Sequence, residues 1–293
     1  MTRSNIWLRH SIKSLSSIKI SNNVTAKRPL GIIAGSGSLP LIVAKAHSAH
    51  SGGNVFIATL RGMPTSDHSP YESKEFAVGA VEPVFEYFRS HKVIDIVMIG
   101  GMQRPNFSSI KVDTTGAKLL GRILKSKLLG DDKLLRIIAR FFEENNFRIV
   151  SAVSVLSGES TITPSVITDK SPSAADYKDI AFGFKAAKNL GAKDIGQSVI
   201  VQDRALIASE DEDGTDKMIA RNGRKGALLV KVMKPIQDDR LDIPAIGINT
   251  VENAAKAGLS GIAIEADKVI VIEREKVIKK ANELGIFIAG VEV

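Results

Sequence analysis

Short apolar strands that run directly into glycine turns constrain the fold of this chain more than any other feature. Leu30–Ala34 leads into a Gly-Ser-Gly turn, and Leu41–His50 follows with the apolar spacing of a helix. Ile94–Ile99 is a second apolar strand, and it ends at a Gly-Gly pair. A strand, a glycine turn and a helix open a nucleotide-binding α/β unit, in which amides at the helix N-terminus face an anion. The sequence therefore predicts an α/β fold with a Rossmann-like first half. The residues that we expect to bind a phosphorylated substrate at these turns are Gly35, Ser36, Gly37, Gly100, Gly101 and Arg104.

The first glycine turn does not carry the complete dinucleotide fingerprint. Its pattern is G-x-G-x-x-P, with Pro40 where the third glycine belongs. The missing glycine disfavours a nucleotide-dependent oxidoreductase. A single turn of this kind is also often only a tight connection between a strand and a helix. The turn therefore indicates a nucleotide site without establishing one.

A second candidate segment runs from residue 226 to residue 247. It opens as an apolar strand, Ala227–Val232, and then becomes a loop that contains Pro235 and Pro244. Proline lacks a ladder donor and fixes φ, so the segment leaves the sheet as a stiffened loop. Lys and Arg hold phosphate oxygens, while carboxylates hold a divalent metal or orient water. The alternative is a solvated, charged surface turn. The candidate residues are Lys231, Lys234, Gln237, Asp238, Asp239, Arg240 and Asp242.

The acidic run Glu210–Asp216 is the third candidate segment. Asp213 and Asp216 lie three positions apart, so they share a face if a helix begins there. Closely spaced carboxylates repel one another unless a cation is near. Helix capping and a solvated acidic turn are the alternative explanation, and capping is also our first interpretation of Asp131 and Asp132, which precede another expected helix.

The length of the chain predicts two domains. Single cores usually stop growing near ~250 residues, and this chain has 293. Residues 156–173 are rich in Ser, Thr, Pro and Gly and lack periodicity, so we expect a linker there. The first domain then spans residues 29–155 and ends in a strand at Arg148–Val155. The second spans residues 174–293 and alternates strands with helices in its last third.

The basic residues concentrate in the first 28 residues. This leader holds six Lys or Arg residues and no acid, which leaves 8 − 6 = +2 of the net charge for the rest of the chain. The near-neutral remainder does not argue for nucleic acid. A transit peptide, an interfacial helix and a disordered leader are open interpretations, and we expect the disordered leader.

The chain has no cysteine, which excludes disulfides, thiolate zinc sites and a cysteine nucleophile. None of its five histidines lies in an acidic or glycine-rich motif, so we expect them on the surface.

Taken together, the motifs resemble one family, the metal-dependent UDP-2,3-diacylglucosamine pyrophosphatases of lipid A biosynthesis found in α-proteobacteria and others. The resemblance covers about Pro29 to Val293. In the family's order and spacing, its motifs here are GIIAGSGSLP (31–40), GGMQRP (100–105), GDDKLL (130–135), DGTD (213–216) and KVMKPIQDDRLDIPAIG (231–247). Two departures are visible: Ser36 stands where the family often has Gly, and Asp213 where we expect Glu.

The resemblance implies hydrolysis of UDP-2,3-diacylglucosamine to UMP and 2,3-diacylglucosamine 1-phosphate, by water attack on the α-phosphorus with Mg²⁺ or another divalent metal. It implies an N-terminal domain for the uridine nucleotide, a C-terminal domain for the acylated sugar, and an active site between them. It also marks Asp242 as essential. The implied catalytic residues are Asp242, Asp216 and Arg240, and the implied metal ligands are Asp213, Asp216 and Asp242. We further expect a cytoplasmic homodimer in peripheral contact with the inner membrane through its lipid substrate.

A non-catalytic module that binds a nucleotide sugar is the rival hypothesis. Binding needs the glycine turn and cations, whereas hydrolysis also needs Asp216 or Asp242 and a metal. The acidic residues therefore discriminate between the two functions.

Overall fold

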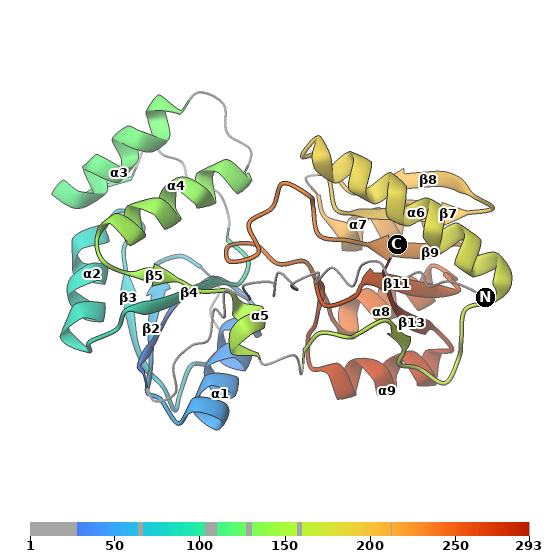
Figure 1. Ribbon diagram of the computed structural model, residues 1–293, viewed down its shortest axis with the longest axis horizontal. Coiled ribbons are helices and arrows are strands. Elements are labelled where there is room, and N and C mark those ends of the chain that lie inside the picture. Colours follow the sequence, from blue (N-terminus) through green and yellow to red (C-terminus); the bar gives the residue numbers. More distant parts are fainter. Residues whose placement is uncertain are drawn as a thin grey trace, which may run out of the picture.

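The structure of the protein, a computed structural model, describes residues 28–63, 67–102, 110–126, 131–156, 160–211 and 213–292. Figure 1 shows two domains side by side, each with a sheet and helices packed against it. The predicted two-domain α/β fold is therefore confirmed. The leader lies outside the described residues, apart from Arg28. No helix in the described ranges is both long enough and apolar enough to cross a membrane.

The N-terminal domain is built on a parallel sheet. Its elements are β1 (Leu30–Ala34), α1 (Leu39–Ser51), β2 (Val55–Leu60), β3 (Glu72–Phe76), α2 (Val81–Ser90), β4 (Asp95–Ile99), α3 (Thr114–Lys125), α4 (Asp131–Glu144), β5 (Arg148–Ile149) and α5 (Ala152–Val155). The strand order is β3-β2-β1-β4-β5, and every pair is parallel. The apolar strands are buried because α2, α3 and α4 pack on one face and α1 and α5 on the other. The order reverses between β1 and β4, which makes a topological switch point of the kind where such folds bind ligands.

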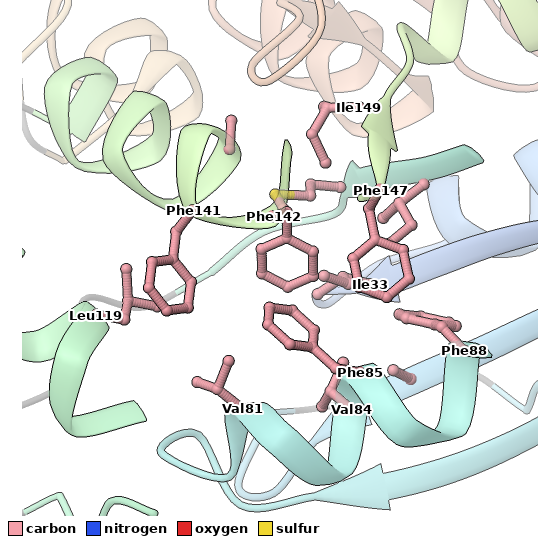
Figure 2. Packing of buried hydrophobic residues seen from close by; sticks show 14 of the residues in the cluster. Ile33, Val81, Val84, Phe85, Phe88, Leu119, Phe141, Phe142, Phe147 and Ile149 are labelled. Carbon is pink, nitrogen blue, oxygen red and sulfur yellow. The ribbon is translucent and has the colours of Figure 1, made fainter. Parts of the chain in front are cut away.

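An aromatic core holds α2 and α4 on one face of this sheet. Figure 2 shows Phe85 of α2 pointing toward Phe142 of α4 and toward Phe147. The ring centroids of Phe85 and Phe142 lie 4.8 Å apart, edge to face, and those of Phe85 and Phe147 lie 5.1 Å apart. Each such pair contributes roughly 0.5–1.5 kcal/mol beyond its buried area. Leu119 and Ile123 join the core from α3, so α3 is held by one face.

The C-terminal domain has a mixed sheet of six strands in the order β6-β13-β11-β9-β7-β8. Its elements are β6 (Ser165–Val166), α6 (Ala174–Ala192), β7 (Ser198–Gln202), β8 (Ala205–Ser209), α7 (Thr215–Asn222), β9 (Leu228–Lys231), β10 (Ala245–Ile246), α8 (Ile248–Lys256), β11 (Gly261–Glu265), β12 (Ile270–Val271), α9 (Arg274–Leu284) and β13 (Phe287–Val291). Strands β9, β11 and β13 are parallel, and β7 and β8 form an antiparallel hairpin. Helix α6 packs on one face, and α7, α8 and α9 on the other.

The segment after β9 carries the C-terminal half of the chain back to the N-terminal domain. We call residues 232–244 the crossing loop. Leu241 packs into the aromatic core, and Ile243 packs with Ile270 against the opposite face of the N-terminal sheet. The hydroxyl of Ser151 donates to the carbonyl of Asp239 at 2.8 Å. The domains are therefore in contact through buried side chains as well as joined by the chain between them.

Part of the expected linker, residues 156–173, lies on the C-terminal domain. Strand β6 pairs with β13, and Ile162 is buried in the core beneath α8 and α9. The N–H of Val271 donates to the carbonyl of Ser160 at 2.6 Å. The described residues from 160 onward are thus packed as part of that domain.

Two expectations from the sequence are wrong. Only the first two residues of Arg148–Val155 form a strand, and the rest turns into α5, with Ser151 at the N-cap. A short apolar run fits a buried helix as well as a buried strand, so periodicity did not separate them. His47 and His68 are buried rather than on the surface. The ring Nε2 of His47 donates to the carbonyl of Arg28, 3.0 Å away, which ties the start of the domain to α1.

Candidate active site between the two domains

The turns after β1 and β4 lie against each other at the switch point. The N–H of Ser36 donates to the carbonyl of Gly101 at 2.7 Å, and the N–H of Gly101 donates to that of Ser36 at 2.9 Å. The N–H of Gly35 donates to Ile99 at 2.8 Å. The two predicted turns therefore meet, with Gly37 continuing the first of them. Because these three amides bond within the protein, phosphate binding by the turns stays a prediction.

Glycine is required for this close approach. A Cβ on Gly35 would lie 2.5 Å from the carbonyl oxygen of Gly101, and one on Gly100 would lie 2.7 Å from the carbonyl carbon of Gly35. Gly100 also has φ +104°, which other residues rarely adopt. Arg104, the candidate cation of the second turn, lies outside the described residues.

A cavity of about 470 Å³ opens beside these turns. Apolar side chains of β1, β4, α2, α3 and α4 form most of its wall, and Asp242 of the crossing loop reaches it from the C-terminal half of the chain. Gly100 and Gly101 border it as well. The volume falls within the ~300–1,000 Å³ of small-molecule pockets. An apolar cavity with a carboxylate at its edge suits a ligand that joins a long apolar part to a polar head.

Asp242 lines this cavity and is otherwise surrounded by protein. The side-chain amide of Gln237 donates to Asp242 Oδ2, and the N–H of Lys234 donates to Gln237 Oε1 at 3.1 Å. Burial raises the pKa of Asp242, and the charge of Asp132 adds to the rise. The charges of Lys234 and Lys231 and the hydrogen bond from Gln237 oppose it. A positioned carboxylate with a raised pKa is a candidate proton acceptor.

Two lysines place positive charge near Asp242. Lys234 Nζ lies 2.8 Å from Asp194 Oδ1 and is half-buried. Lys231 is buried at the end of β9, where its Nζ donates to Thr215 Oγ1 at 2.7 Å. The charges of both lysines lower the pKa of Asp242, against the rise that burial causes. The structure therefore brings together four of the residues predicted in this segment, Lys231, Lys234, Gln237 and Asp242.

A buried carboxylate holds Lys231 in place. Glu210 Oε1 lies 3.9 Å from Lys231 Nζ and accepts from the hydroxyl of Thr215 at 2.5 Å, while Glu210 Oε2 accepts from the N–H of Gln197. Burial raises the pKa of Glu210, but Lys231 and these hydrogen bonds outweigh it, so the net pKa lies below the ordinary value. Glu210 thus stays ionised beside the ammonium group.

Arg240 fastens the crossing loop to α4. Its Nε and Nη2 donate to the two carboxylate oxygens of Asp238 at 2.9 and 2.7 Å, and its Nη1 donates to Glu143 Oε1 at 2.7 Å. These hydrogen bonds lower the pKa of Asp238 and raise that of Arg240. Arg136 of α4 donates to the carbonyl of Ile236 in the same loop. The contacts described for Arg240 are structural, and its predicted catalytic role stays a prediction.

Asp213 and Asp216 lie at the start of α7. Asp213 pairs with Lys217 at 2.8 Å and with Arg221 at 2.5 Å, and hydrogen bonds from these two residues lower its pKa. Asp216 is exposed in the first turn of α7. Among the described residues, no three His, Asp or Glu side chains gather closely enough to hold a metal ion. The set Asp213, Asp216 and Asp242 therefore does not form one cluster here, and its role as a metal site stays a prediction.

The carboxylates of Asp242 and Asp132 nevertheless suit one divalent metal, Mg²⁺. Mg²⁺ is usually bound by one or two carboxylates, with substrate phosphates and water completing its shell. Asp242 faces the cavity, and Asp132 lies near enough to raise its pKa. Asp132 also pairs with Arg136 at 2.9 Å, so it is more than a helix cap. A pair of this kind fits a metal that arrives with a diphosphate.

The fold and the site define a two-domain α/β protein with a candidate catalytic carboxylate at the domain junction. Residues 29–158 match the LpxI N-terminal domain and residues 163–289 match the LpxI C-terminal domain, so the chain belongs to the LpxI family. UDP-2,3-diacylglucosamine pyrophosphatase LpxI of Caulobacter vibrioides is 34% identical over 276 residues, which cover 90% of this chain and 98% of that protein. The resemblance inferred from the motifs is confirmed.

Sequence reasoning missed the buried partners of the site. Glu210 and Thr215 belong to the acidic run, for which a solvated turn was one interpretation, yet both are buried and contact Lys231 directly or through one another. Asp132 was interpreted as a cap. Each depends on a contact between residues far apart in the sequence, for which a local pattern gives no signal.

Proposed function

We propose that the protein hydrolyses the pyrophosphate bond of UDP-2,3-diacylglucosamine, giving UMP and 2,3-diacylglucosamine 1-phosphate in lipid A biosynthesis. Membership of the LpxI family supports this activity. The observation that carries the proposal is the position of Asp242, at the edge of an apolar cavity and within reach of two lysine charges. That arrangement offers a place for acyl chains beside groups suited to a diphosphate.

The polar residues of the site supply the functions that hydrolysis needs. Lys231 and Lys234 offset the negative charge of the diphosphate, which otherwise repels the attacking water. Asp242 orients that water and accepts its proton while the water oxygen bonds to the α-phosphorus. The bond from this phosphorus to the bridging oxygen breaks, and the lipid phosphate leaves with that oxygen. No covalent intermediate with the protein is required.

Asp242 and Asp132 are the residues that would hold a divalent metal such as Mg²⁺. When bound, the metal supplies further neutralisation of phosphate charge. Asp132 lies near enough to Asp242 to raise its pKa, which favours these two carboxylates as the ligands over Asp213 and Asp216.

The cavity supports a changed orientation of the substrate. From the sequence we expected the acyl chains on the C-terminal domain and the uridine nucleotide on the N-terminal one. The large apolar cavity lies beneath α3 and α4 of the N-terminal domain, which favours this domain for the acyl chains. The uridine end then extends from Asp242 toward the C-terminal domain and its lysines.

The activity is tested by incubating the purified protein with UDP-2,3-diacylglucosamine, with and without EDTA, and measuring UMP. We expect UMP to form and EDTA to abolish its formation, with recovery on adding Mg²⁺. Binding of the substrate without UMP under any metal condition would instead support a non-catalytic nucleotide-sugar-binding module.

A homodimer and a cytoplasmic location are further parts of the proposal. The mass of the protein in solution, measured by light scattering after gel filtration, tests the dimer. Fractionation of cells that make the protein tests the location. A monomeric mass or recovery outside the cytoplasm would contradict the respective part without affecting the hydrolase assignment.

A further inference from the structure

Helix α3 lies at the outer edge of the N-terminal domain, beyond α4 (Figure 1). Its inner face is apolar: Leu119 and Ile123 are buried in the aromatic core, and Leu120 lines the cavity. The same helix therefore forms part of the cavity wall and part of the outer surface of the molecule. What its outer face binds is a question separate from catalysis.

The outer face of α3 is cationic and carries one large apolar side chain. The helix contains Lys118, Arg122 and Lys125 and no Asp or Glu. Arg122 pairs with Glu144 of α4 at 2.6 Å, but neither lysine pairs with a carboxylate of the described residues. Leu124, next to Lys125 in the chain, is 65% exposed. A helix that exposes lysines and a leucine suits the surface of an anionic bilayer, where cations meet headgroups and the apolar side chain enters the interface.

The cavity opens to solvent near the start of α3. Met102 and Val112 line the cavity, and they are 45% and 37% exposed, so they lie at its opening. Val112 stands two residues before α3 begins. A lipid that leaves a bilayer apposed to α3 therefore meets the cavity opening at the same side of the molecule.

We propose that the outer face of α3, formed by Lys118, Leu124 and Lys125, docks the protein on an anionic phospholipid bilayer, so that acyl chains pass from the bilayer into the cavity. The inference rests on the proposed function, because a diacylated substrate resides in a membrane. The charge of the face selects a bilayer with acidic headgroups over a neutral one. The exposed leucine and the adjoining apolar cavity favour a bilayer over an acidic protein partner.

Sedimentation of the full-length protein with vesicles tests the proposal. We expect binding to phosphatidylcholine vesicles that contain phosphatidylglycerol, weaker binding at high salt, and little binding to pure phosphatidylcholine. Lys118→Glu/Lys125→Glu should lower partitioning by at least ~10-fold, because two attractive charges become repulsive. The matched control is Lys256→Glu/Lys279→Glu on α8 and α9 of the other domain, both exposed, which changes the net charge equally and should partition like the wild type.

Activity on detergent-dispersed substrate separates docking from catalysis. Neither Lys118 nor Lys125 lines the cavity, so the α3 variant should keep wild-type turnover there. Wild-type partitioning of the α3 variant would place the contact elsewhere, for example on the basic leader, and overturn the proposal. Equal loss in the control variant, or no preference of the wild type for anionic vesicles, would also overturn it. Failure of the hydrolase assignment would instead appear as absent turnover in detergent with docking intact.

Discussion

Asp242 differs from its acidic neighbours in what its side chain contacts. Asp238 pairs with Arg240 and accepts two hydrogen bonds from its guanidinium group. Asp239 is exposed, and its backbone carbonyl accepts from Ser151. Asp242 alone of the three lines the apolar cavity, where Gln237 fixes one of its oxygens. The crossing loop therefore presents one carboxylate to a ligand in the cavity.

We predict that Asp242→Asn lowers turnover by at least ~10²-fold, the lower range for losing a positioned acid–base group. The amide keeps the shape of the side chain but neither accepts a proton at neutral pH nor holds a metal as a carboxylate does. Substrate binding should survive, because the lysines and the cavity remain. Turnover and equilibrium binding are measured for Asp242→Asn, with Asp239→Asn as the control on the same loop. Similar turnover in both variants would remove Asp242 from the chemistry.

Glu210 supports a prediction about stability. Glu210→Gln leaves Lys231 buried without its carboxylate, and breaking a buried ion pair costs roughly 3–5 kcal/mol. We expect urea denaturation to show a loss of this order relative to wild type and to the exposed control Glu275→Gln. Because the folded-state pKa of Glu210 is lowered, its contribution is complete above the unfolded value of ~4.3 and is lost as pH falls through the folded value.

The lowered pKa of Glu210 also predicts how the destabilisation by Glu210→Gln depends on pH. The wild type should lose more stability on acidification below ~4.3 than Glu210→Gln does, so the difference between the two proteins should shrink. A difference that is constant with pH would show that Glu210 acts through packing rather than through its charge.

At the scale of elements, the crossing loop depends on α4 for its position. Arg240 bridges Asp238 in the loop and Glu143 in the helix. This bridge gives Arg240 a positioning role that does not require contact with substrate. It also explains why the crossing loop packs on the N-terminal domain although it has two prolines, and five charged residues from 234 to 242.

We predict that Arg240→Met and Glu143→Gln both lower turnover, the first by roughly 10-fold or more, because a misplaced catalytic group loses rate steeply. If Arg240 only positions the loop, the two variants should change turnover in the same direction without a matching change in substrate affinity. Turnover and KM are measured for both. Wild-type turnover in Glu143→Gln with a large rise of KM in Arg240→Met would assign Arg240 to direct contact with substrate.

The walls of the cavity support a prediction about chain length. Leu120 of α3 lines the cavity, so Leu120→Trp should fill part of it and raise KM for a long-chain diacyl substrate by about 10-fold, within the range for a pocket that loses room. A short-chain analogue should be affected less. Leu206→Trp, at an exposed position on β8, is the control. An equal effect on both chain lengths, or an effect only in the control, would contradict acyl binding in this domain.

The sequence predicted most elements because their periodicity is strong, and it failed where a segment is short. The expected helix Leu41–His50 lies within α1, and Ile94–Ile99 differs from β4 by one residue. Strands β6 and β10 have two residues each and carry no periodic signal. Within the site, glycine turns and the charged loop were visible as local patterns. The contacts of Glu210 and Thr215 with Lys231 of β9, and the cavity under α3, arise only when separate elements pack together.

At the scale of the whole molecule, the site exists because the two domains touch. The N-terminal domain contributes the cavity, and the crossing loop and β9 contribute Asp242 and both lysines. Leu241 and Ile270 bury the contact on opposite faces of the N-terminal sheet. The family resemblance placed the active site between the domains, and the structure shows how a loop of the second domain reaches the first: Leu241 packs into its core, and Arg240 bonds with Glu143 of α4.

The basic leader is outside this arrangement, which gives a prediction about the whole chain. A variant that begins at Lys27 retains Arg28, whose carbonyl bonds with His47, and it retains every residue named in the site. It loses four of the six leader cations, Arg3, Arg9, Lys13 and Lys19, and no acid. We therefore expect wild-type turnover in detergent and an unchanged thermal midpoint, because no described contact of the core requires residues 1–26. Both are measured beside the full-length protein at the same protein concentration. A large fall in turnover or in the midpoint would show that the leader packs on the folded domains and contributes to the site.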